Sequence, residues 1–250
     1  MFAGVDGESF RWVLALALVA VGLSALAATT RPDALEGAAH DAVEMPERIV
    51  SLSPPITETL VALGARELLV GRSDYCAIPE DSGAPIPGVG TALTPAWERL
   101  VRLRPERIIT EKLQGQSASP LAAVAPTTVL PWLRVDQAAQ SIETLGRITG
   151  RLEEAAALKN RFLVELASTA RADAPRMLLL LGPTGPGDGP LFYARPGSLH
   201  GAALEAAGFR NAINEPTDGA PSLSVEGLIA AGADVMVILV PDARFSSSSK

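Results

Sequence analysis

The sequence predicts an α/β protein made of two Rossmann-like lobes joined by one long backbone helix. From residue 47 onward, short β-branched runs alternate with segments of helical periodicity. The second half of the chain repeats the pattern of the first half, and a stretch with apolar residues at helical spacing lies between them. With 250 residues, of which 48% are hydrophobic, the chain is long enough for two small lobes and too apolar to be disordered.

The first 27 residues are predicted to be a secretory signal segment. Residues 12–28 are uncharged and nearly all apolar, Arg11 precedes them, and Ala25-Leu26-Ala27 matches the small-x-small pattern of a cleavage site. The uncharged run barely reaches the length of a membrane span, so an uncleaved anchor is the alternative. In either case the rest of the chain is exported. Residues 28–46 are polar, lack periodicity and are expected to form a flexible lead.

Residues 47–134 are predicted to form the first α/β lobe. Its strands are expected at residues 48–52, 68–70, 107–110 and 127–130. A helix over residues 57–63 is ended by Gly64, at the position after its C-cap. A second helix over residues 96–103 is opened by Thr94-Pro95, with the threonine as N-cap.

Residues 135–173 are predicted to form the linking helix, and residues 174–250 the second lobe. Apolar residues recur at helical spacing through the linking segment. A single rod between two lobes indicates a fairly rigid pair with a cleft between them. In the second lobe, strands are expected at residues 176–181 and 234–240, and helices at 198–207 and 225–231. Ser224 or Ser222 is expected to cap the last helix.

Two short sequence matches relate the lobes. At an offset of 128 residues Glu98 aligns with Glu226, and at an offset of 144 residues Gly64 aligns with Gly208. Both matches agree with a duplicated α/β unit. Each glutamate is predicted in the first turn of its helix, where the helix dipole favours a carboxylate.

Composition and motifs exclude several chemistries. A net charge of −7 argues against nucleic acid as a partner. One cysteine and two histidines leave little for a metal centre, and the lone Cys76 is expected to be a buried small residue. No nucleophile-elbow, zinc-protease or Walker-A motif occurs, and the loop over residues 182–190 carries too many prolines to cradle a phosphate. We therefore expect a binding protein with no catalytic residue, metal site or cofactor.

Ligands of open α/β lobes bind beyond the carboxyl ends of the strands. The residues expected there are Ser53, Pro54, Pro55, Ser73–Cys76, Glu111, Lys112, Trp132, Pro183, Thr184, Tyr193–Arg195, Pro241 and Asp242. Tyr75, Trp132 and Tyr193 stand out, because a flat ring with a polar handle suits a large planar or chelate ligand. Each ring is also able simply to fill the edge of its lobe, which is the interpretation we favour for Trp132. Arg195 either pairs with an anionic ligand group or is solvated.

Several stretches carry a family resemblance. They include RIVSLSPPITETLVALG at 48–64, LVGRSDYCAIP at 69–79, PGVGTALTPAWERLVRLRP at 87–105, GSLHGAALEAAGFRN at 197–211 and LSVEGLIAAGADVMVIL at 223–239. They resemble the helical-backbone (class III) periplasmic substrate-binding proteins of ABC importers for cobalamin, iron–siderophore complexes and haem. The stretch SDYCAIP is most similar to the cobalamin-binding branch, where the tyrosine that matches Tyr75 lines the corrin pocket.

The resemblance implies a periplasmic substrate-binding protein, monomeric when free, that binds cobalamin or a related corrinoid between its lobes. The ligand-binding residues are then expected to be Pro54, Pro55, Tyr75, Glu111, Tyr193 and Arg195. The resemblance also implies that Glu98 and Glu226 dock on arginines of a two-fold symmetric permease in the inner membrane. An iron–siderophore or haem ligand is the alternative within this class, and an enzyme or a membrane-anchored sensor domain is the alternative outside it. Family members continue with another strand and helix, so we expect either that the sequence is truncated or that the second lobe is incomplete.

Overall fold

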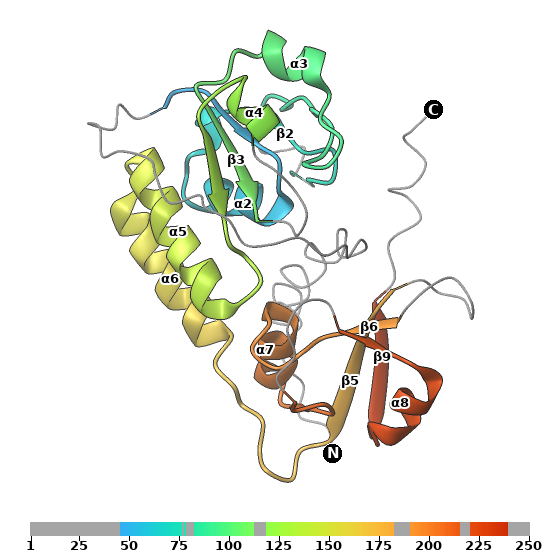
Figure 1. Ribbon diagram of the computed structural model, residues 1–250. Coiled ribbons are helices and arrows are strands. Elements are labelled where there is room, and N and C mark those ends of the chain that lie inside the picture. The colour runs from blue at the N-terminus through green and yellow to red at the C-terminus, as the bar shows by residue number, and fades with distance from the viewer. Residues whose placement is uncertain are drawn as a thin grey trace. The chain divides into compact units, whose positions relative to one another are not determined.

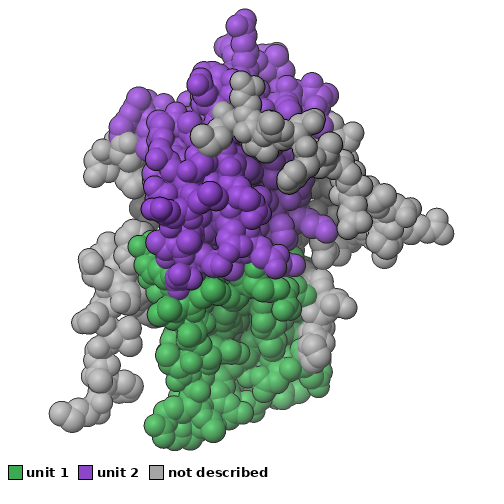
Figure 2. Space-filling view, turned by 90° about the vertical axis from the view of Figure 1, so that its left-hand side faces the viewer, with its two compact units in different colours: residues 1–24, 133–136, 161–250 green, residues 25–132, 137–160 purple. Residues whose placement is uncertain are grey.

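The computed structural model describes residues 46–76, 78, 83–112, 119–182, 191–215 and 221–239 (Figure 1). The predicted signal segment, and all of the predicted lead except Pro46, lie outside these ranges. The described residues divide into two compact units (Figure 2). Residues 46–132 with 137–160 form what we call the N-unit, and residues 133–136 with 161–239 form the C-unit. Within the described ranges, no helix has both the length and the apolar character needed to cross a membrane.

The N-unit is built on a four-stranded parallel sheet. Its strands are β1 (Ile49–Ser51), β2 (Leu69–Arg72), β3 (Arg107–Glu111) and β4 (Thr127–Leu130), in the order β2-β1-β3-β4. All neighbouring pairs run parallel. β1 is buried along its whole length and so is the middle of β3, as expected for parallel strands covered on both faces. The four predicted strands of this lobe are confirmed to within two residues at each end.

Two helices flank this sheet, α2 (Pro54–Ala62) and α3 (Trp97–Arg102), together with the short helices η2 (Arg66–Leu68) and α4 (Ser119–Ala122). α2 begins earlier than predicted, because its first two residues are prolines and the first turn of a helix leaves its N–H groups unpaired in any case. Beyond the C-cap, Gly64 has a φ of 71°, which favours glycine.

The predicted cap of α3 is wrong. The helix begins at Trp97, its N-cap is Ala96, and no side chain caps it. The Thr94 N–H instead donates to Thr91 Oγ1 at 3.0 Å. The Ala96 N–H donates to Val89 O at 2.8 Å, so backbone pairing delays the start of the helix.

The predicted linking helix is two helices, α5 (Val135–Thr149) and α6 (Leu152–Glu165), which lie side by side (Figure 1). α5 ends in a Schellman turn, in which Gly150 has a φ of 68° and the Arg151 N–H donates to Gly146 O at 2.8 Å. A Cβ on Gly146 would overlap a side chain of α6, so the helices pack closely there. The prediction of one continuous rod is therefore wrong, because the chain turns back at Gly150.

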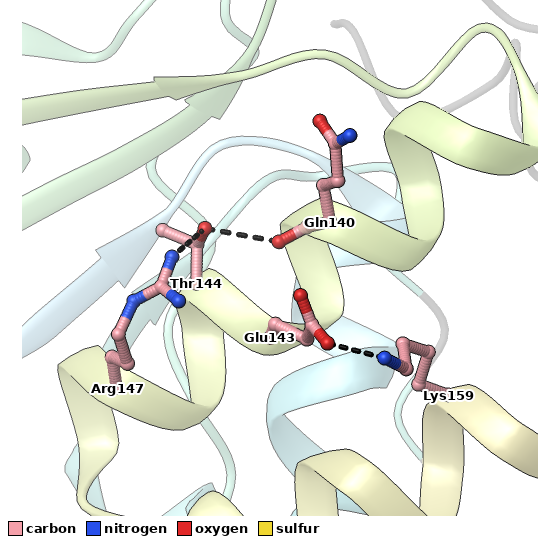
Figure 3. Close-up of polar contacts among 5 residues, drawn as sticks. All are labelled: Gln140, Glu143, Thr144, Arg147 and Lys159. Atoms are coloured by element: carbon pink, nitrogen blue, oxygen red, sulfur yellow. Dashed lines mark hydrogen bonds and ion pairs between the residues drawn. The ribbon is translucent and has the colours of Figure 1, made fainter.

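Polar contacts on the α5–α6 hairpin are drawn in Figure 3. Lys159 of α6 forms an ion pair with Glu143 of α5, and this contact holds the pKa of Glu143 below its usual range. On α5, Thr144 Oγ1 donates to Gln140 O at 2.9 Å and Arg147 Nη2 donates to Thr144 Oγ1 at 2.9 Å. Solvent-exposed pairs of this kind add little to stability, so the hairpin depends mainly on helix packing.

The sheet of the C-unit is centred on β5 (Arg176–Leu181). Its other strands are β6 (Leu191–Tyr193), β7 (Arg210–Asn211), β8 (Ser222–Leu223) and β9 (Val235–Leu239). β7 and β9 pair with β5 in parallel, whereas β6 pairs with it antiparallel and carries β8 on its other side. The predicted strands β5 and β9 are confirmed, and the three shorter strands are additions of the structure.

The C-unit has two further helices, α7 (Leu199–Ala206) and α8 (Val225–Ala230). A serine caps each of them: Ser198 Oγ accepts a backbone N–H at 3.1 Å, and Ser224 Oγ accepts one at 3.2 Å. Of the two candidates for the cap of α8, the structure selects Ser224.

The internal repeat holds in the structure. α3 and α8 begin at Trp97 and Val225, and β3 and β9 begin at Arg107 and Val235, so both pairs differ by 128 residues. The 144-residue match relates the ends of α2 and α7, where the glycine of each pair, Gly64 or Gly208, has a positive φ. In both units, parallel strands pair with the central strand, which is β1 or β5.

Candidate functional site

The carboxyl ends of the N-unit strands bring four predicted residues to one edge of the sheet. Because the strands are parallel, the residues that end or follow them lie at the same edge. Their order follows the order of the strands: Tyr75 after β2, Ser53 after β1, Glu111 at the end of β3, and Trp132 after β4. We call this set the N-unit edge.

A hydrogen bond joins two residues of the N-unit edge. Ser53 Oγ donates to Glu111 Oε2 at 3.1 Å, between neighbouring strand ends. Burial raises the pKa of Glu111, and the Ser53 hydrogen bond acts against this rise. The partly desolvated carboxyl group can accept hydrogen bonds from a ligand or, when protonated, donate one.

A buried polar network lies beneath the edge. Thr57 Oγ1 donates to Ser51 Oγ at 2.8 Å, and Ser51 Oγ donates to Ser53 O at 3.1 Å. Cys76 Sγ donates to Thr57 Oγ1 at 3.1 Å. The network ties the turn after β1 to the turn after β2. The prediction of a buried Cys76 is confirmed, and burial raises the pKa of its thiol to about 11.

Tyr75 is the exposed aromatic residue of the N-unit edge, with 42% of its surface accessible. Hydrogen bonds from backbone N–H groups hold its turn: the Tyr75 N–H donates to Ser73 Oγ at 3.3 Å, and the Asp74 N–H donates to Gly90 O at 2.8 Å. The Gly90 N–H donates back to Asp74 Oδ1 at 3.2 Å. A fixed backbone therefore presents a ring that a ligand can reach.

The other predicted residues of this edge are less accessible. Pro54 and Pro55 are buried in the first turn of α2, so they shape the turn that holds Ser53. Trp132 is buried as well, in keeping with a side chain that fills the edge of its lobe. The accessible side chains of the set are thus Tyr75 and, in part, Glu111.

The structure places the predicted C-unit residues differently from the sequence interpretation. Tyr193 ends β6, is only 7% exposed, and packs with Leu178 and Leu180 in the core of the unit. Because β6 runs antiparallel to β5, the chain after Tyr193 runs back along β5, and the Ala194 N–H donates to Leu179 O at 2.8 Å. Tyr193 and Arg195 therefore do not follow the carboxyl end of a parallel strand. Residues 183–190 and 240–250, which follow β5 and β9, lie outside the described ranges, whereas residues 212–215 follow the parallel strand β7.

Glu98 and Glu226 occupy equivalent places. Each is the second residue of its helix, α3 or α8, and each is exposed. A bond to its own backbone N–H and one to the side chain of Ser224 lower the pKa of Glu226, so its carboxylate is charged at neutral pH. In the part of the chain that the structure describes, no three His, Cys, Asp or Glu side chains are grouped so as to hold a metal ion.

Comparison with known proteins assigns a family. The family model described as "Periplasmic binding protein" matches residues 49–248. The chain belongs to this family. The match covers both units, and the fold with two lobes, the mixed α/β elements and the parallel sheet agrees with that of its structural neighbours.

Relatives within the family carry different ligand names. A "Cobalamin-binding protein" of Halobacterium salinarum is 29% identical over 232 residues, which are 88% of this chain and 61% of the relative. The chain thus spans about three fifths of the length of the curated relatives that it matches. A periplasmic haem-binding protein from Roseiflexus sp. RS-1 has a TM-score of 0.63 at 26% identity, covering 77% of this chain and 76% of that one. The periplasmic vitamin B12 binding protein of Vibrio cholerae has a TM-score of 0.58 at 21% identity, with coverages of 78% and 76%.

The sequence predicts Ser53, Tyr75 and Glu111 at one edge of the sheet but does not predict the hydrogen bond between Ser53 and Glu111. The signal for the pair was present, since both residues come directly after or at the end of runs that form neighbouring strands. What the sequence lacks is the strand order, which decides that the two ends are adjacent.

Proposed function

We propose that this chain is the substrate-binding component of an ABC importer, exported to the periplasm, where it captures a metal chelate. The observation that carries the proposal is the N-unit edge, where the exposed Tyr75 ring shares a sheet edge with the Ser53–Glu111 pair. Membership of the periplasmic binding protein family supports it.

The ligand that we propose is cobalamin or a related corrinoid. Tyr75 offers a flat apolar face to a planar macrocycle. Glu111 accepts or donates hydrogen bonds at the rim, where a corrin carries neutral amide groups. The curated relatives at 29% identity are named for cobalamin, which supports the same choice.

An iron–siderophore or haem ligand is the second candidate. Solved haem-binding neighbours at 26% identity favour haem. The carboxylates of haem call for a cationic partner, for which Arg195 is the predicted residue. Haem would place those carboxylates close to an acidic group if it lay on the N-unit edge, and this disfavours haem relative to a corrinoid.

Native mass spectrometry of the protein expressed in a periplasm tests the ligand. We expect a co-purifying mass of a corrinoid, and calorimetric titration with cyanocobalamin that is tighter than with haemin or ferrichrome. Tighter binding of haemin or ferrichrome would replace the corrinoid by the second candidate. The proposal would be overturned if none of the three compounds bound and the mass spectrum showed the protein without a co-purifying ligand.

For docking we propose that Glu98 and Glu226 meet cationic side chains of the importer's permease. The variant Glu98→Ala/Glu226→Ala is expected to keep its ligand affinity and most of its thermal stability and to lose uptake that depends on the permease. Glu153→Ala/Glu154→Ala is the matched control, because it also removes two exposed carboxylates from the first turn of a helix. Normal uptake by the first variant would remove the docking role.

A further inference from the structure

The exposed ring of Tyr75 lies on a turn of four residues. The Cys76 N–H donates to Ser73 O at 3.0 Å, which closes a β-turn with Asp74 and Tyr75 at its central positions. Ser73 and Cys76 are buried, and the Ser73 N–H donates to Ser51 O of β1 at 2.8 Å. The two ends of the turn are thus fixed to the N-unit, whereas its two central residues are exposed. The contacts of these central residues therefore determine how firmly the ring is held.

Asp74 ties the centre of this turn to residues 87–90, which we call the support segment. The Asp74 N–H donates to Gly90 O at 2.8 Å, and Asp74 Oδ1 accepts the Gly90 N–H at 3.2 Å. The Asp74 side chain also lies against Gly88. A Cβ added to Gly88 would be 2.2 Å from Asp74 Oδ1, and the next two atoms that it would meet also belong to Asp74. Glycine at position 88 therefore leaves the space that the Asp74 side chain occupies.

The support segment is itself held firmly. Gly88 pairs in parallel with Arg72 at the end of β2, and the Val89 N–H donates to Arg72 O at 2.9 Å. Val89 is fully buried in the N-unit core. From α3, Arg99 Nη1 donates to Gly88 O at 2.8 Å. Asp74 thus joins the exposed centre of the turn to a segment that is fixed to both the sheet and a helix.

We propose that Asp74 is a positioning residue of the ligand site, which holds the Tyr75 ring in place through the support segment before a ligand binds. A group that is already ordered loses less conformational freedom on binding, so the affinity is higher. The carboxylate acts here as an acceptor for a backbone N–H, a role that an amide oxygen can also fill. The inference rests on the proposed function and adds to it, because it names a residue that raises the affinity without touching the ligand.

Calorimetric titration with cyanocobalamin tests the positioning role. Asp74→Ala is expected to weaken binding by about three- to tenfold, because the ring must then be ordered when the ligand binds. Asp74→Asn is expected to recover most of this loss, since its Oδ1 still accepts the Gly90 N–H. An equal loss in both variants would show that the ligand meets the charge of Asp74 directly, and it would overturn the positioning role.

Asp234→Ala is the matched control, and it is expected to leave the affinity for cyanocobalamin unchanged. Asp234 is also exposed, and its Oδ2 accepts a backbone N–H, that of Arg176, at 2.8 Å in the C-unit. An equal loss of affinity in Asp234→Ala and Asp74→Ala would overturn the inference.

Double variants show whether Asp74 acts through the ring. In the Tyr75→Ala protein, Asp74→Ala is expected to cause no further loss of affinity. The same loss with and without the Tyr75 ring would overturn the inference. Gly88→Ala is expected to reproduce the loss of Asp74→Ala, because the added Cβ displaces the Asp74 side chain. In the Asp74→Ala protein it is expected to add nothing, and a further loss there would assign the effect of Gly88 to another group and overturn this contact.

Fluorine NMR of protein labelled with 3-fluorotyrosine tests the ring without a ligand. The chain has two tyrosines, and Tyr193 in the core of the C-unit is an internal reference. Asp74→Ala is expected to move the Tyr75 signal toward its position in the unfolded protein and to leave the Tyr193 signal in place. A Tyr75 signal that does not move would overturn the inference and leave the proposed function standing. Failure of the wild-type protein to bind cyanocobalamin would overturn the proposed ligand and, with it, the positioning role.

Discussion

The N-unit and the C-unit contain the same helix–strand pair, yet the repeated strand is buried in one unit and half exposed in the other. Ile108 and Thr110 of β3 are buried, whereas Met236 and Ile238 at the same positions of β9 are about half exposed. β3 lies between β1 and β4, but within the described ranges β9 pairs with β5 alone. The repeated sequence thus determines where the strand lies along the chain, whereas the segments packed against the strand determine how far its side chains are buried.

The neighbours of β3 can be named. Leu121 and Ala125, from the segment between β3 and β4, pack with Ile108 in one core cluster. The described part of the C-unit holds no counterpart of this segment. The same strand pattern therefore contributes more stability in the N-unit than in the C-unit. Four predictions compare residues of the N-unit with residues of the C-unit.

The largest effect is expected from truncating the repeated strand. Ile108→Ala should lower the free energy of unfolding of the N-unit by about 2–5 kcal/mol, since it opens a cavity in a packed core. Met236→Ala should lower that of the C-unit by less than about 1 kcal/mol, because the side chain is half solvated already. Hydrogen exchange followed by mass spectrometry measures each unit separately. Equal costs at the two positions would contradict the comparison.

The two tyrosines are expected to differ in kind. Tyr75→Ala should weaken ligand binding by about 1–3 kcal/mol and leave stability nearly unchanged, because the ring is exposed. Tyr193→Ala should lower the free energy of unfolding of the C-unit by about 3 kcal/mol, because the ring is part of the core. Calorimetry and thermal melting measure the two quantities. Unchanged affinity in Tyr75→Ala would remove Tyr75 from the site.

A smaller effect on stability is expected from replacing Glu58 of α2. The 144-residue offset relates Glu58 to Ala202 of α7. Burial raises the pKa of Glu58 from 4.5 to about 7. The folded protein thus prefers the protonated form, and the stability that this group contributes is present below pH 4.5 and lost as the pH rises to 7. Glu58→Ala, which makes α2 resemble α7, should therefore raise the free energy of unfolding at pH 8 by about 1 kcal/mol, after allowance for partial solvation.

Urea unfolding at pH 4 and pH 8 checks the Glu58 prediction. The gain from Glu58→Ala should be absent at pH 4, where the carboxyl group is protonated in both states. Glu58→Gln serves as the control, since it keeps the shape of the side chain and removes only its charge. If both variants changed the free energy of unfolding equally at pH 4 and pH 8, burial of the Glu58 charge would not be the cause of the change.

The smallest effect is expected at the two N-caps of the repeated helix. The 128-residue offset relates Ala96 of α3, which provides no cap, to Ser224 of α8, which does. Ser224→Ala should lower the free energy of unfolding of the C-unit by about 0.5–1 kcal/mol. Ala96→Ser should raise the free energy of unfolding of the N-unit by less. The ψ of Ala96 is 81°, whereas Ser224, which caps its helix, has the extended backbone of an N-cap with a ψ of 170°. Melting temperatures check both signs.

Much of the fold could be predicted because its signals are local. Short runs of apolar and β-branched residues located six strands, and Gly64 and Ser224 marked helix ends correctly. The errors arose where tertiary contacts decide. The close approach of α6 at Gly146 fixes the turn after α5, and the backbone bond from Ala96 to Val89 delays α3. Neither contact leaves a mark in the local pattern.

The places of the candidate site residues could be predicted better in the N-unit than in the C-unit for one reason. The rule that ligands lie at the carboxyl ends of strands applies to parallel strands, and all N-unit strands are parallel. In the C-unit the two-residue and three-residue strands β6, β7 and β8 are too short to show a pattern, and one of them reverses the direction of the chain that carries Tyr193. The sequence likewise does not show that Tyr75 is exposed and Tyr193 buried, because the accessibility of a side chain depends on what packs against it.

The buried state of Cys76 has a practical consequence for labelling. The thiolate is the form that reacts with maleimides and oxidants, and a thiol with a pKa of about 11 in a buried site supplies very little of it at neutral pH. The chain has no other cysteine. A cysteine introduced at an exposed position such as Val164 would therefore accept a fluorophore selectively in the folded protein, and the native thiol would become reactive only on unfolding. One chain then carries a dye at a chosen surface position and a native thiol whose reaction reports unfolding.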